Sequence, residues 1–93
     1  MIKIFRTIDG HIHQLNEASE GCWVVLANPT ATEILETANK FHIDQDDLRA
    51  PLDEEERSRI EVEDDYTLIL VDIPVIEERN EKDWFGTVPL GII

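Results

Sequence analysis

The stretch that decides the fold runs from Tyr66 to Ile76 and reads YTLILVDIPVI. Successive side chains of a strand point to opposite faces of its sheet, so Leu68 to Val71 presents apolar side chains on both faces. A strand of this kind is buried above and below. We therefore expect this segment to be the central strand of a sheet, with a covering layer on each face.

The flanking segments predict the neighbours of this strand. Upstream, Ile60 and Val62 alternate with glutamates, which is typical of a half-exposed strand. Downstream, residues 77–83 are polar and predict a solvated loop. Residues 84–93 then predict a last strand that pairs back on the central one.

The N-terminal third predicts further strands. Residues 1–15 favour a β-hairpin, because Asp9-Gly10 suits the positive φ angles of a tight turn between two apolar segments. After a polar loop, residues 22–26 form an apolar run bounded by Gly21 and Pro29, which predicts a short buried strand.

Two helices are predicted between these strands and the central one. Thr30 and Glu33 have the spacing of a capping box, in which each side chain accepts a hydrogen bond from the other residue's amide. The amphipathic helix behind it is expected to end near His42. Asp44 can cap a second, shorter helix, which Pro51 closes.

The predicted order is therefore β-β-β-α-α-β-β-β, an α/β fold (α+β, with a mixed sheet and helices on one face). The chain has no residues left for the second layer that the central strand requires. Residues 88–93 also stop without a polar tail. We therefore expect residues 1–93 to be a fragment, an incomplete αβα sandwich that lacks its C-terminal helical layer.

Composition excludes several functions. The net charge of −13 over 93 residues repels phosphate groups, so it disfavours nucleic acid and anionic membrane surfaces as partners. Cys22 is the only cysteine, which excludes an internal disulfide and a zinc site made of thiolates. No apolar run approaches the ~20 residues of a membrane helix. No nucleophile has an evident partner and no glycine-rich phosphate loop is present, so we expect no enzyme.

Acidic side chains are the candidate cation ligands. Asp44, Asp46 and Asp47 lack the glycine and the closing glutamate of an EF-hand loop, so helix capping is the favoured interpretation. In residues 53–59, the carboxylates are expected to pair with Arg57 and Arg59. Magnesium coordination remains compatible with these groups, because this ion keeps most of its waters and needs only one or two carboxylates.

The chain also resembles a known family. In order and spacing, several segments are similar to the cytoplasmic N-terminal domain of the CorA-type magnesium and cobalt transporters. These segments are Trp23 to Thr30, Phe41 to Ile43, Leu52 to Glu61 followed by Asp64-Asp65-Tyr66, and Thr87 to Ile93.

The resemblance implies a regulatory and assembly domain of a homopentameric divalent-cation transporter. The full-length protein would lie in the cell membrane with this domain on its cytoplasmic side, and the stalk and membrane helices would be absent from residues 1–93. In the family, magnesium bound between neighbouring subunits holds the pore closed. Alternatives are the same domain of a zinc-transporting relative, or a stand-alone acidic domain that binds a basic protein.

One departure from the family concerns the regulatory metal site. Many members have an acidic pair where this chain has Arg49 and Ala50, and an aspartate of that pair is a metal ligand. A guanidinium and a methyl group cannot coordinate magnesium. Regulation would therefore have to use other carboxylates, such as those of Asp46 or Asp47.

Overall fold

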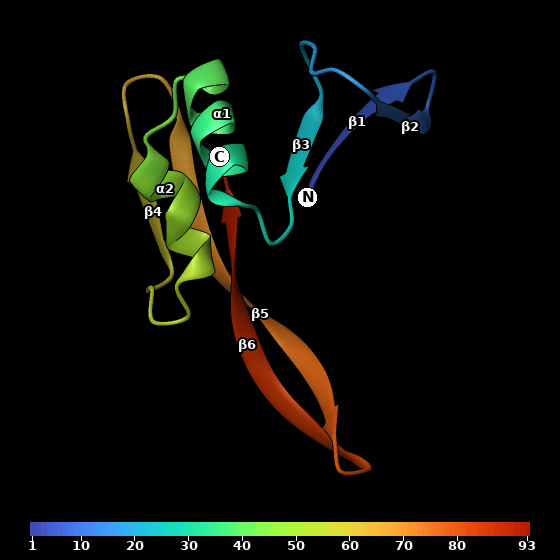
Figure 1. Ribbon diagram of the computed structural model, residues 1–93, viewed down its shortest axis with the longest axis vertical. Helices are drawn as coiled ribbons and strands as arrows, with labels where there is room; N and C mark the ends of the chain where they lie inside the picture. The colour runs from blue at the N-terminus through green and yellow to red at the C-terminus, as the bar shows by residue number, and fades with distance from the viewer. The chain divides into compact units, whose positions relative to one another are not determined.

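The computed structural model describes all of residues 1–93 (Figure 1). The chain divides into two units, Met1–Glu36 and Thr37–Ile93. Three strands, two helices with a short 3₁₀ turn, and three further strands follow one another along the chain. The α/β class and the element order predicted from the sequence are confirmed.

The first unit contains a three-stranded antiparallel sheet. Its strands are β1 (Ile2–Ile8), β2 (His11–Leu15) and β3 (Trp23–Leu26), and β1 lies in the centre. Asp9 and Gly10, with φ of 51° and 78°, form the turn between β1 and β2. This confirms the predicted hairpin, since two consecutive positive φ angles match the twist of the strands on either side.

The third strand is more exposed than the sequence predicts. Trp23 is 75% exposed and Val25 39%, whereas Val24 and Leu26 on the opposite face are partly buried. The prediction of a buried strand is therefore wrong for the face that carries Trp23. An apolar sequence shows which side chains favour burial, but a layer of structure must lie against them.

The first helix, α1 (Ala31–Phe41), begins and ends with well-defined caps. The Glu33 amide donates to Thr30 Oγ1 at 3.1 Å, and the Thr30 amide donates to Glu33 Oε1 at 2.9 Å. At the other end, His42 has a φ of 55° and the Ile43 amide donates to the Ala38 carbonyl at 3.0 Å. This is the Schellman pattern. The predicted capping box and helix end are confirmed.

The second unit contains α2 (Gln45–Arg49), the 3₁₀ turn η1 (Ala50–Leu52) and a second antiparallel sheet. The strands of that sheet are β4 (Arg59–Val62), β5 (Thr67–Arg79) and β6 (Lys82–Ile92), in the order β4-β5-β6. The predicted central position of the strand that contains Leu68 to Val71 is therefore confirmed.

The core of the second unit lies on one face of β5. Leu68 is fully buried, Leu70 is 2% exposed, and both pack with Ala50 of η1. On the opposite face, Ile69 and Val71 are only partly buried, and Leu90, opposite Val71 on β6, is 42% exposed. Two covering layers were expected for this strand, one on each face. Within this unit only one of them is present, on the face that carries Leu68 and Leu70.

Two details differ from the sequence predictions. The strands form two separate antiparallel sheets in place of one mixed sheet. Residues 77–83 are not a loop, because β5 and β6 continue through them to a two-residue turn at Asn80 and Glu81, with φ of 52° and 62°. Beyond Val71 only β5 and β6 continue (Figure 1), and most of their side chains there are exposed, so charged side chains are compatible with this two-stranded ribbon.

Candidate functional site

The sequence-predicted metal candidates lie on the first turn of α2. Asp44 occupies the N-cap position in an extended conformation, and its Oδ1 accepts a hydrogen bond from the Asp46 amide at 2.8 Å. Asp46 and Asp47 follow in the first helical turn, where carboxylates complement the positive end of the helix. Asp46 is exposed and Asp47 is partly buried. The capping role predicted for this acidic segment is confirmed.

Tyr66 contacts the same turn from the end of the β4–β5 connection. Its hydroxyl accepts a hydrogen bond from the Asp44 amide at 3.2 Å and donates one to Asp47 Oδ2. The bond to the Asp47 carboxylate raises the pKa of Tyr66, because it stabilises the protonated phenol, although the Asp44 amide acts in the opposite direction. Sequence reasoning placed Tyr66 at the start of a strand and missed this contact.

The structure brings Asp46 and Asp47 together as neighbours on one turn, but they do not form part of a larger cluster. Across residues 1–93, no group of three or more His, Cys, Asp or Glu side chains is placed to hold a metal ion. Arg49 Nη2 donates to Gln45 Oε1 at 3.0 Å, so its guanidinium lies along the same short helix. What α2 offers a cation is therefore one or two carboxylates.

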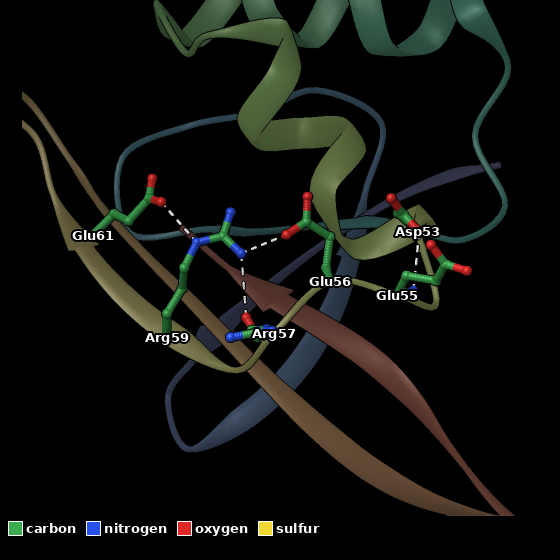
Figure 2. Close-up of polar contacts among 6 residues, drawn as sticks. All are labelled: Asp53, Glu55, Glu56, Arg57, Arg59 and Glu61. Carbon is green, nitrogen blue, oxygen red and sulfur yellow. Dashed lines mark hydrogen bonds and ion pairs between the residues drawn. The ribbon is translucent and has the colours of Figure 1, made fainter.

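Arg59 on β4 pairs with a carboxylate of the acidic segment after η1 and with one of its own strand, as Figure 2 shows. Arg59 forms ion pairs with Glu56 at 2.5 Å and with Glu61 at 2.7 Å. Hydrogen bonds to Glu61 and then Glu56 raise the pKa of Arg59. Asp53 Oδ1 accepts from the Glu55 amide at 2.9 Å.

The predicted pairing of this segment is confirmed for Arg59. Arg57 differs, because its carbonyl accepts from Arg59 Nη1 at 3.2 Å while its own guanidinium forms no ion pair. Two carboxylates thus converge on one arginine, and they are less available to a cation than those of α2.

His11 and His13, which share one face of β2, are both exposed. In the register of the hairpin they pair with Ile8 and Arg6. A cation beside Arg6 would be repelled by its guanidinium. Strand β2 has no carboxylate between the two imidazoles. A metal ion bound by His11 and His13 would therefore lack a third protein ligand.

The first unit also presents an apolar hollow on the face of its sheet. It has a volume of about 360 Å³ and is lined by Phe5, Arg6, Thr7, Ile12, Trp23 and Val25. Ile12 and Trp23 are each 75% exposed. Exposed apolar patches can mark surfaces that contact another protein, a membrane or an apolar ligand. The hollow is therefore a candidate contact surface, whereas α2 is the candidate cation site.

Comparison with known proteins places the fold. No family model and no curated protein matches the sequence. No helix of the structure combines the length and apolar character needed to cross a membrane. Among solved structures, however, there is a match over nearly the whole chain, and it shows which known fold the chain shares.

The matching structure is the CorA magnesium transporter from Methanocaldococcus jannaschii. It superposes with a TM-score of 0.72 over 99% of this chain, at 24% sequence identity. The chain corresponds to 29% of the length of that transporter chain. The resemblance to the CorA type inferred from the sequence is thus confirmed at the level of the fold.

Proposed function

We propose that this chain is a regulatory and assembly domain of a divalent-cation transporter of the CorA type. The observation that carries the proposal is the fold match, which covers 99% of the chain, together with the ordered motif resemblance. Such a domain would act without catalysis, on the cytoplasmic side of the cell membrane. Magnesium and cobalt would be the transported ions.

The test of transport uses the full-length gene product. We expect its sequence to contain two apolar segments of ~20 residues, enough to span a bilayer. We also expect it to restore growth of a magnesium-uptake-deficient strain at low magnesium. An open reading frame without apolar segments would refute the transporter and favour the stand-alone acidic domain, which the net charge of −13 supports.

The identity of the ion is tested in the same strain. Uptake of magnesium and cobalt that zinc does not inhibit would support the magnesium and cobalt assignment. Uptake of zinc in preference to magnesium would assign the chain to a zinc-transporting relative.

For regulation, we propose that Asp46 and Asp47 contribute carboxylates to a magnesium site completed by a neighbouring subunit. Two adjacent carboxylates on α2, one of them exposed, support this assignment. A hydrated magnesium ion binds through one or two carboxylates, so one subunit alone would bind it weakly. In calorimetry we therefore expect weak magnesium binding to residues 1–93.

The full-length protein provides the sharper test of these two residues. The double variant D46N/D47N should remove the inhibition of uptake by internal magnesium, because amides lose the charge that attracts the ion. The control E54Q/E55Q changes the charge by the same amount at exposed positions outside α2. Equal loss of inhibition in both variants would show an effect of overall charge and would refute the assignment.

Assembly is proposed to be homopentameric, with other subunits of the same protein as partners. The exposed apolar face around Ile12 and Trp23 supports a role in subunit contacts. Sedimentation of the full-length protein in detergent should give a pentamer. A monomer that retains transport activity would contradict this part of the proposal.

A further inference from the structure

At the N-terminus of each helix, the N-cap residue and the acidic residue three positions later take part in the cap. The hydrogen bonds that connect these two residues differ between α1 and α2. In α1, the N-cap Thr30 and Glu33, three residues later, bond each other's amides directly. In α2, Asp44 and Asp47 have the same spacing. The N-cap amide of Asp44 donates to the hydroxyl of Tyr66, and Tyr66 in turn donates to Asp47.

The two caps also differ in the side chain at the third helical position. Asp47 is one methylene shorter than Glu33, and its carboxylate accepts from the Tyr66 hydroxyl, whereas that of Glu33 accepts from the N-cap amide directly. The Tyr66 hydroxyl fills the gap because it is both a donor and an acceptor. Tyr66 is itself held by the turn that precedes β5, where the Glu63 amide donates to the Tyr66 carbonyl at 2.9 Å.

We propose that Tyr66 is a positioning residue that completes the N-terminal cap of α2 by relay and thereby ties that helix to the β4–β5 turn. The relay joins Asp47, the Tyr66 hydroxyl and the Asp44 amide. It spans 19 residues of sequence between Tyr66 and Asp47, whereas the box of α1 is entirely local. The position of α2 therefore depends on a tertiary contact.

This arrangement has a consequence for cation binding. Tyr66 donates to Oδ2 of Asp47, so a cation that replaces the hydroxyl at this oxygen would release α2 from the turn before β5. This consequence rests on the proposed function. The relay itself does not, because it needs no metal.

The test of the relay is amide hydrogen exchange, measured by NMR on residues 1–93 without added metal. Tyr66→Phe removes the hydroxyl alone. We expect exchange of the Asp44 amide to accelerate about fivefold, the factor that corresponds to one ordinary net hydrogen bond. The amides of Thr30 and Glu33 are internal controls, because the direct box of α1 does not involve Tyr66.

The second variant separates a relay from a merely structural role of the ring. Y66F/D47E lengthens the N3 side chain to that of α1, so a direct capping box can form, and protection of the Asp44 amide should return. If Y66F unfolds, recovery of folding in Y66F/D47E supports the relay in the same way. No restoration by D47E, or an unchanged Asp44 exchange rate in folded Y66F, would overturn it.

The metal-dependent consequence is tested separately, by titrating magnesium into the full-length protein. Displacement of Tyr66 predicts faster exchange of the Asp44 amide as magnesium binds. If exchange does not change although D46N/D47N abolishes regulation, then magnesium does not displace Tyr66 from Asp47, and the displacement is refuted while the proposed function stands.

Discussion

Gly91 offers a sharp test of how the second unit is packed. It lies on β6 opposite Leu70, on the face that η1 covers. A Cβ added at Gly91 would lie 2.2 Å from Cγ of Pro51, 3.2 Å from its Cβ and 3.4 Å from its Cδ. The proline ring is rigid and cannot swing away, so Gly91→Ala forces η1 and β6 apart.

The magnitude can be worked out with a control on the same strand. Overpacking of this kind costs about 1–3 kcal/mol. Replacing a glycine also stabilises by about 0.4–1 kcal/mol, because the unfolded chain loses freedom. Gly86→Ala serves as the control, because it should show only the stabilising loss of freedom in the unfolded chain. A Cβ added at Gly86 would meet only Val75, at 3.9 Å, and neither Gly86 nor Gly91 has a positive φ.

We therefore expect Gly91→Ala to lower the free energy of unfolding and Gly86→Ala to raise it slightly. The two variants should differ by about 1–3 kcal/mol, because the entropic contribution cancels between them. Urea denaturation followed by circular dichroism measures both. For a domain of this size, each kcal/mol corresponds to a Tm shift of about 4–8 °C.

A double-mutant cycle tests whether the clash with Pro51 causes the destabilisation expected for Gly91→Ala. Pro51→Ala removes Cγ and Cδ of the ring, so G91A should destabilise the P51A background less than the wild type by about 1 kcal/mol or more. Equal stabilities of G91A and G86A, or an additive effect of P51A and G91A, would refute the packing of η1 on β6.

Three further predictions concern the caps and the core. Thr30→Ala should lower the free energy of unfolding by about 1 kcal/mol in urea denaturation, because the Glu33 amide loses its acceptor. Hydrogen bonds from the Thr30 amide and then from the N-terminal amino group hold the pKa of Glu33 below its usual value. The ionised Glu33 carboxylate therefore stabilises the fold above pH ~4.5, and this contribution is lost as the pH falls below that value. Glu33→Gln should flatten the acid side of the curve of unfolding free energy against pH, and an unchanged curve would contradict this. Leu68→Ala should cost about 2–5 kcal/mol, against less than 1 kcal/mol expected for Ile60→Ala, since Leu68 is fully buried and Ile60 is 67% exposed.

The candidate site was only partly predictable from the sequence. The capping role of Asp44 was predicted, because it depends on a hydrogen bond to an amide two residues away. The contact of Asp47 with Tyr66 was missed, because nothing local to either residue specifies that they meet. Asp47 gave no local signal for this contact, because an aspartate at the third helical position can also close a direct capping box.

The amino-acid sequence by itself determined the local structure of this protein. The box of Thr30 and Glu33, the turn at Asp9-Gly10 and the apolar run from Leu68 to Val71 specify helix start, hairpin and central strand, because each acts over a few neighbouring residues. The same kind of local rule failed at residues 77–83, where polar composition predicted a loop. There, pairing between two strands continued regardless of side-chain polarity.

Only the tertiary structure decided which apolar surfaces are covered and which distant residues meet. Leu68 and Trp23 both come from apolar strands, yet one is fully buried and the other is 75% exposed. The fit of Pro51 over Gly91 and the relay through Tyr66 likewise join residues far apart in sequence. Burial and long-range bonds depend on where whole elements pack, and that position is set by the sum of many contacts rather than by any one segment.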